Sequence, residues 1–176
     1  MRGVGRRGVI IVVKDGLLMS KLKIYLDTSV ISHLNALDAP QQMMDTLKLW
    51  EDIKADLYDV CISDLTIAEL DQCVEPKRSE MLSSLLDIDY IELEQDERAR
   101  QLSQLYFEVG GLPSKSKEDA MHIAIASVND CDIVLSWNFK HIVNLRAMTA
   151  VEDVNIRKRY KNIRILSPTM LLDWGE

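Results

Sequence analysis

Three acidic side chains and one amide occupy positions from which they could act together on a metal ion. Asp27 and Asn138 each follow a short apolar run. Glu69 and Asp119 instead lie within segments that are rich in apolar residues. A carboxylate that faces a protein interior is costly unless it is paired or bound to a cation. We therefore expect these four groups to share one site with a divalent cation.

The residue types indicate which cation and which reaction to expect. Carboxylates that converge in one cleft repel each other at neutral pH, and a divalent cation relieves that repulsion. Oxygen ligands that leave room for water suit Mg²⁺ or Mn²⁺, whereas zinc sites favour His and Cys. Such an ion beside a phosphodiester orients the substrate, activates a water and stabilises the leaving oxygen. The set predicts hydrolysis of a phosphodiester.

Each of the four residues also has an ordinary structural explanation. Asp27 could simply cap a helix, and Glu69 could be a solvated helix residue. Asp119 could be an acid favoured by the dipole in the first turn of a helix, and Asn138 could be a turn residue. Composition and periodicity alone leave several metal-handling or phosphate-handling α/β proteins open.

We expect the histidines and cysteines to have structural rather than metal-binding roles. We interpret His122 and His141 as packing or surface groups rather than ligands. The cysteines Cys61, Cys73 and Cys131 lack the spacing of a zinc site, and we interpret them as free thiols of a reducing cytoplasm.

Five apolar stretches alternate with helical patterns along the chain, which predicts an α/β fold with a mostly parallel sheet. The first helix is expected to be capped by Thr28 or Ser29. Ligands in such folds collect at the carboxyl ends of strands, where Asp27 and Asn138 are expected. The expected strands are 22–26, 59–62, 90–93, 132–135 and 163–166. The expected helices are 30–37, 40–55, 65–73, one starting at Pro76, 95–109, 117–129, most of 139–162, and 168–174.

The bulk composition fits one globular domain. The chain has 176 residues, 47% of them hydrophobic, and we find no apolar run long enough to span a membrane. We expect residues 1–20 to be an extension or a misassigned start, with Met19 as the natural start, and residues 21–174 to be the domain. The net charge of −7 is unusual for a protein that binds phosphate, although a local basic patch is compatible with it.

Four segments resemble, in order, the motifs of the PIN-domain nucleases, and the size and helix–strand order are similar to those of the VapC-type toxins of toxin–antitoxin pairs. The four segments are 24–31 with Asp27, 63–70 with Glu69, 117–124 with Asp119, and 132–142 with Asn138. One such motif is weak evidence, but four in the same order are strong evidence.

The resemblance implies a three-layer α/β/α sandwich and an endoribonuclease that depends on Mg²⁺ or Mn²⁺. Asp27, Glu69 and Asp119 would hold the metal, and Asn138 would line the site with them. Supporting positions would be Thr28, Ser29 and Ser136.

The resemblance also implies partners. They are an RNA substrate, a cognate antitoxin that inserts a segment near the site, and a second copy in a homodimer. Lys115, Lys117 and Lys140 flank the motifs and could meet RNA phosphates, although solvated surface lysines are an equal alternative.

One departure from the family pattern concerns Asn138, because many members carry an aspartate there. An amide can ligate through its oxygen but brings no charge, so we expect one well-held metal rather than two. Asp132 lies too early in its strand to substitute. A haloacid-dehalogenase-type phosphatase would need an acid where Ser29 stands, and a receiver domain would need an early acidic pair. The alternative that stays open is an inactive PIN fold that binds RNA or protein.

Overall fold

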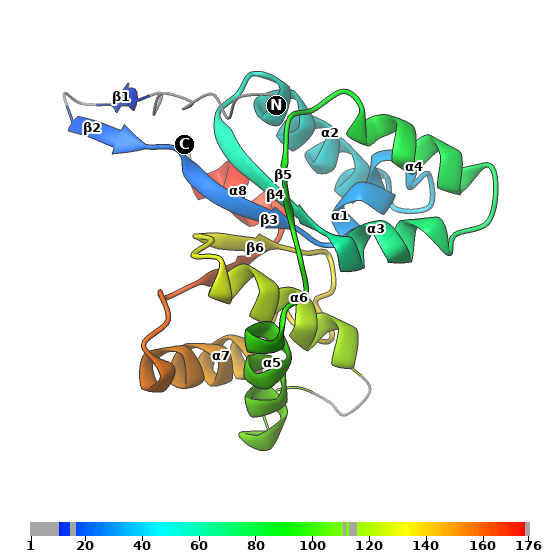
Figure 1. Cartoon of the computed structure of the whole chain (residues 1–176). Coiled ribbons are helices and arrows are strands. Elements are labelled where there is room, and N and C mark those ends of the chain that lie inside the picture. Colours follow the sequence, from blue (N-terminus) through cyan, green and yellow to red (C-terminus); the bar gives the residue numbers. More distant parts are fainter. Residues whose placement is uncertain (1–10, 15–16, 111, 113–115, 175–176) are drawn as a thin grey trace, which may run out of the picture.

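A five-stranded parallel sheet forms the centre of the computed structural model, which describes residues 11–14, 17–110, 112 and 116–174 (Figure 1). The strand order is β5-β4-β3-β6-β7, and each neighbouring pair is parallel. These strands are β3 (Leu22–Leu26), β4 (Tyr58–Ser63), β5 (Ile91–Leu93), β6 (Ile133–Leu135) and β7 (Arg164–Leu166). All five expected strands are confirmed, each to within one residue at either end.

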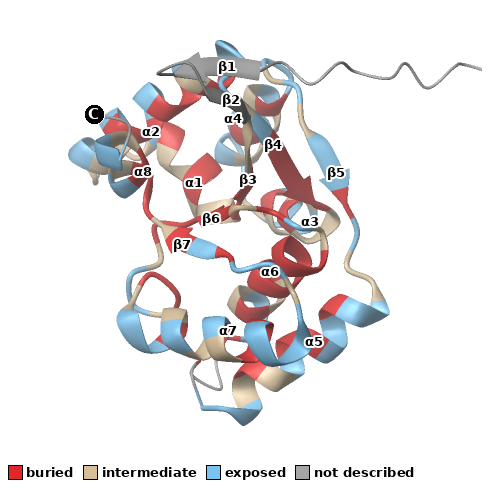
Figure 2. Cartoon of the chain, turned by 90° about the vertical axis from the view of Figure 1, so that its left-hand side faces the viewer, coloured by how far each residue is buried: buried red, intermediate tan, exposed pale blue. Residues whose placement is uncertain are grey.

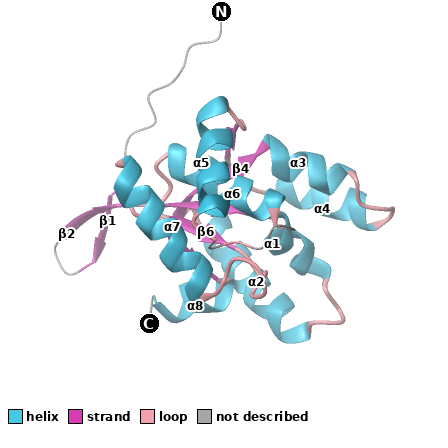
Figure 3. Cartoon of the chain, turned by 90° about the horizontal axis from the view of Figure 1, so that it is seen from below, coloured by secondary structure: helices cyan, strands magenta, loops and turns pink. Residues whose placement is uncertain are grey.

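Helices cover both faces of this sheet, which confirms the three-layer α/β/α architecture. One face carries α1 (Thr28–Ser32), α2 (Pro40–Lys54), α3 (Asp64–Asp71), α4 (Lys77–Leu85) and α8 (Pro168–Trp174). The other face carries α5 (Glu97–Glu108), α6 (Lys117–Val128) and α7 (Leu145–Lys158), which lie in front of the strands in Figure 3.

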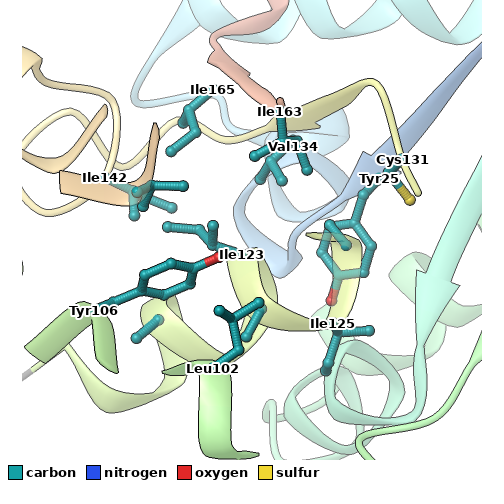
Figure 4. Close-up of a cluster of buried hydrophobic side chains, with 14 of the residues drawn as sticks. Tyr25, Leu102, Tyr106, Ile123, Ile125, Cys131, Val134, Ile142, Ile163 and Ile165 are labelled. Carbon is teal, nitrogen blue, oxygen red and sulfur yellow. The ribbon is translucent and has the colours of Figure 1, made fainter. Parts of the chain in front are cut away.

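The central strand β3 contributes side chains to both cores. Ile24 and Leu26 belong to the core under α1 and α2, whereas Tyr25 belongs to the core under α5 and α6. Successive side chains of a strand point to opposite faces, so a fully apolar strand must be covered on both sides. Figure 2 shows the resulting burial along β4 and α6, and Figure 4 shows Tyr25 within the core under α5 and α6.

The first helix differs from its prediction in its length and in its cap. Residues 30–37 do not form one helix, because α1 ends at Ser32 and a 3₁₀ turn, η1 (His33–Asn35), follows it. The cap of α1 is neither Thr28 nor Ser29 but Asp27, whose side chain accepts a hydrogen bond from the Val30 amide.

The helix expected over most of 139–162 is shorter than predicted. Residues 136–144 form turns, in which the Asn138 carbonyl accepts from the amides of Ile142 and Val143. Helix α7 begins only after Asn144, because that side chain caps it by accepting from the Ala147 amide at 3.0 Å.

The expected N-terminal extension lies partly outside the described residues. Within it, β1 (Ile11–Lys14) pairs antiparallel with β2 (Leu17–Ser20), in a sheet separate from the central one. The boundary at residues 20 and 21 stays a prediction. Among the residues that the structure describes, no helix is both long enough and apolar enough to cross a membrane.

Candidate active site

The carboxyl ends of three neighbouring strands meet where the candidate site residues lie. Asp27 follows β3, Ser136 follows β6, and Ser63 ends β4. The Asp27 amide donates to the Leu135 carbonyl at 3.2 Å, so the ends of β3 and β6 are held side by side. The sheet topology thus gathers residues that are far apart in the sequence.

Asp27 is buried, with 4% of its surface exposed, and its carboxylate is held by neutral donors. Oδ1 accepts from the Val30 amide at 3.2 Å and from the Ser29 hydroxyl at 2.5 Å. Ser29 Oγ in turn accepts from the Trp137 amide at 2.8 Å and lies 3.4 Å from Ser136 Oγ. Ser29 contacts Asp27 directly, and Ser136 lies beside Ser29.

The pKa of Asp27 is raised above its usual range because the carboxyl is removed from water. The Coulombic influence of His122 and the hydrogen bonds from Ser136 and Ser29 oppose that effect without cancelling it. Among the residues that the structure describes, none forms a salt bridge with Asp27.

Glu69 lies in α3, which starts directly at the end of β4. Ser63 caps this helix by accepting from the Thr66 amide at 3.1 Å. Glu69 Oε2 accepts hydrogen bonds from Thr28 Oγ1 and from His122 Nε2, the latter at 3.2 Å. Partial burial raises the pKa of Glu69, but the hydrogen bond from His122, the Coulombic influence of that imidazole in its protonated form and the Thr28 hydroxyl outweigh the burial, so the pKa is lowered.

Asp119 lies in the first turn of α6 and contacts Asn138 directly. Its Oδ1 accepts from Asn138 Nδ2 at 2.9 Å, and its Oδ2 lies 3.0 Å from His141 Nδ1. Asn138 Oδ1 accepts from the His141 amide at 3.2 Å, which fixes the orientation of the Asn138 side chain. The structure thus brings together Asp119 and Asn138.

His122 is buried and His141 is partly buried, and both contact candidate site acids, which their residue types alone did not predict. His122 pairs with Glu69, and His141 pairs with Asp119. Tyr25 was also missed, although its hydroxyl lies 2.6 Å from His122 Nδ1. A signal was present, because Tyr25 is two residues before Asp27 in a strand and His122 is three residues after Asp119 in a helix.

The structure describes two of the three lysines that are expected to contact RNA phosphates. Lys117 opens α6 beside Asp119, and Lys140 follows Asn138 in the turn region, both exposed. Lys115 lies outside the described residues.

The carboxylates fit a hard divalent cation that keeps part of its water. Asp27, Glu69 and Asp119 supply only oxygen ligands, and Asn138 adds an amide oxygen. In the part of the chain that the structure describes, no three His, Cys, Asp or Glu side chains are close enough to hold an ion directly. Because Mg²⁺ usually keeps several waters, one or two direct carboxylates with water-bridged neighbours are sufficient.

A separate cavity of about 380 Å³ lies at the other end of β4. Its lining includes Asp45, Asp52, Tyr58 and Asp173, and none of the candidate site acids. This cavity is therefore separate from the candidate site at the carboxyl ends of the strands.

Comparisons with known proteins identify the family and the fold. The family model described as PIN domain matches residues 24–140. The structure resembles VapBC2 of Rickettsia felis, solved bound to a DNA fragment from its promoter, with a TM-score of 0.50, 15% identity, and coverage of 83% of this chain and 98% of that one.

Two other solved structures are similar at lower scores. DNA-bound VapBC of Salmonella typhimurium has a TM-score of 0.45 and 18% identity, and covers 84% of this chain and 98% of its own. VapC20 of Mycobacterium tuberculosis, described as a toxin that cleaves the sarcin–ricin loop, has a TM-score of 0.46 and 19% identity. The match covers 63% of this chain and 86% of that one. No curated protein sequence matches significantly. The family match spans well over half of the sequence, and the chain belongs to the PIN domain family.

Proposed function

We propose that this protein is an endoribonuclease that depends on Mg²⁺ or Mn²⁺ and acts in the cytoplasm as the toxin of a toxin–antitoxin pair. Three observations support the proposal: Asp27 directly follows β3, Glu69 contacts the neighbouring Thr28, and Asn138, just after β6, contacts Asp119. In a PIN domain, oxygen ligands at this place support phosphodiester hydrolysis.

In this proposal the site residues have different roles. Asp27, Glu69 and Asp119 would hold the cation, which when bound supplies an activated water and charge stabilisation for the leaving oxygen. Asn138 orients Asp119 through its amide hydrogen bond. The exposed Lys117 and Lys140, with Lys115, would meet RNA phosphates near the acids.

Cleavage of RNA by the purified full chain tests this function. We expect cleavage of structured or single-stranded RNA in Mg²⁺ or Mn²⁺, and none in EDTA. Asp27→Asn and Asp119→Asn should each abolish cleavage while the fold is retained. Glu118→Gln is the matched control, because Glu118 is the exposed neighbour of Asp119 in the same helical turn. Cleavage that persists in both Asp variants would refute the metal assignment.

The second candidate function is an inactive PIN fold that binds RNA or protein without cutting. The observation in its favour is the neutral Asn138 beside Asp119, which removes one charge from the site. RNA binding without cleavage under either metal, together with normal growth of bacteria that express the chain, would favour it.

The proposed partners are a cognate antitoxin and a second copy of the chain. VapBC2 of Rickettsia felis, the fold neighbour described above, was solved with DNA from its promoter. The net charge of −7 is compatible with a basic antitoxin arm. Co-expression with the product of a short adjacent upstream reading frame should yield a stable complex, and light scattering should give the mass of a dimer.

A further inference from the structure

The hydroxyl group of Tyr25 is a meeting point for three elements beneath the site. This side chain from β3 is fully buried. Its oxygen lies 2.6 Å from Ser63 Oγ, at the end of β4, and 2.6 Å from His122 Nδ1, in α6. Thr66 Oγ1, in α3, lies at 3.4 Å. One buried atom thus connects the strand that precedes Asp27 with the helices that carry Glu69 and Asp119.

His122 extends this connection to Glu69. The imidazole is buried, with 3% of the residue exposed, and its Nε2 lies 3.2 Å from Glu69 Oε2. Thr28 Oγ1 donates to the same oxygen. Among the residues that the structure describes, Glu69 Oε1 has no hydrogen-bond partner. Both donors therefore hold one carboxylate oxygen and leave the other free for a ligand.

The hydrogen bonds have one consistent direction when the imidazole is neutral. An ionised Glu69 can only accept, so the proton of His122 must be on Nε2. Nδ1 then accepts from the Tyr25 hydroxyl, and the Tyr25 oxygen accepts from the Ser63 hydroxyl. Ser63 Oγ accepts in turn from the Thr66 amide at 3.1 Å. The helix cap of α3 and the tautomer of His122 thus belong to one network.

We propose that Tyr25 and His122 are positioning residues that fix Glu69 so that its Oε1 faces the metal ion. The inference rests on the proposed function, because it takes Glu69 as a metal ligand. Partners that orient a ligand in this way typically change metal affinity by about 10- to 100-fold when they are removed. Neither residue touches substrate in this role, since both are buried.

Tyr25→Phe tests the proposal, with Tyr106→Phe as the matched control. Tyr106 is equally buried in the same core, but its hydroxyl contacts Asn155 at 2.7 Å and Ser127 at 3.1 Å instead of the site. Both variants lose one buried hydroxyl, so similar losses of thermal stability are expected. Only Tyr25→Phe should weaken Mn²⁺ binding to the RNA-free protein, by about 10-fold, as measured by electron paramagnetic resonance of free Mn²⁺.

A second readout follows the tautomer of His122. In ¹⁵N NMR spectra of the full chain, wild type and Tyr106→Phe should show the Nε2–H form. Tyr25→Phe should show a mixture of tautomers, because Nδ1 has lost its donor. In RNA cleavage, Tyr25→Phe should raise the Mg²⁺ concentration for half-maximal rate, and His122→Gln, which keeps a donor, should impair cleavage less than His122→Ala.

The outcomes separate this inference from the proposed function. If wild type cuts RNA but Tyr25→Phe leaves Mn²⁺ affinity and the His122 tautomer unchanged, the positioning role is wrong and the nuclease proposal stands. If wild type cuts no RNA but Tyr25→Phe weakens Mn²⁺ binding, the positioning role stands and the nuclease proposal fails. A wild-type protein that binds no Mn²⁺ contradicts both.

Discussion

At the scale of single residues, Asp27 combines a helix cap with a buried charge. Its Oδ1 caps α1 through the Val30 amide, while burial raises its pKa. The folded protein therefore holds the Asp27 proton more tightly than the unfolded chain does. The ionised form costs stability above the raised pKa, and that cost disappears as the pH falls below the unfolded value.

The first prediction follows from this balance. Metal-free Asp27→Asn should be more stable than wild type at pH 7 by about 1 kcal/mol, because it keeps a capping oxygen and loses the charge. The difference should shrink as the pH falls through the raised pKa of Asp27. Urea unfolding in EDTA across this pH range measures it.

The control is Asp96, whose pKa is shifted in the opposite direction to that of Asp27. Asp96 caps α5 at the surface, and the hydrogen bond from the Ala99 amide lowers its pKa. Its charge contributes stability that is present above the unfolded pKa and lost as the pH falls through the folded one, so Asp96→Asn should not stabilise at pH 7. An Asp27→Asn variant that is less stable than wild type at pH 7 would contradict the account of this site.

The second prediction concerns the amide beside Asp119. Asn138→Asp would place a carboxylate where the amide now donates to Asp119 at 2.9 Å. Like charges at this distance repel, so the metal-free variant should melt at a lower temperature than wild type. Mg²⁺ should recover more stability in the variant than in wild type, as measured by melting with and without the ion. Equal melting temperatures without metal would show that the contact with Asp119 is not maintained.

At the scale of elements, the junctions between strands and helices position the acids. Ser63 ends β4, caps α3 through the Thr66 amide and contacts the Tyr25 hydroxyl. Ser116 precedes α6 in a similar place, and it is also buried. However, its hydroxyl has no hydrogen-bond partner within the described part of the chain.

The third prediction compares these two serines. Ser63→Ala should destabilise the protein by about 1–2 kcal/mol, because a cap and a buried partner are lost together. Ser116→Ala should not destabilise the protein, because a buried hydroxyl that has no partner among the described residues carries a desolvation penalty that the variant removes. Chemical denaturation of both variants measures their free energies of unfolding. Equal losses of stability would contradict the assigned roles.

Local patterns predicted the elements better than the contacts between them. The buried strand 22–26 and the acid at its end, Asp27, follow from short-range apolar patterning. The position of Tyr25 two residues before Asp27 indicates only that it lies near the site. The partners of its hydroxyl lie 38 and 97 residues away, so local spacing does not reveal these contacts. The length of α7 was missed because Asn144 caps it and Asn138 holds the preceding turns, which polar composition alone does not distinguish from helix.

At the scale of the whole molecule, the acidic site adds to a net charge of −7. A cation that binds only the folded chain stabilises it by mass action, by about 2.7 kcal/mol at a concentration 100-fold above Kd. The fourth prediction is that Mg²⁺ raises the melting temperature of wild type but not of Asp119→Asn. A sodium chloride control at equal ionic strength separates site binding from general screening. Equal shifts in both proteins would indicate screening alone.

The central claim is that acids from three elements hold one divalent cation at the carboxyl ends of the strands. Anomalous scattering from crystals of the full chain soaked in Mn²⁺ tests it most directly. We expect one strong Mn²⁺ peak bounded by Asp27, Glu69 and Asp119. No peak there, or a peak only in the cavity lined by Asp45 and Asp52, would contradict the claim.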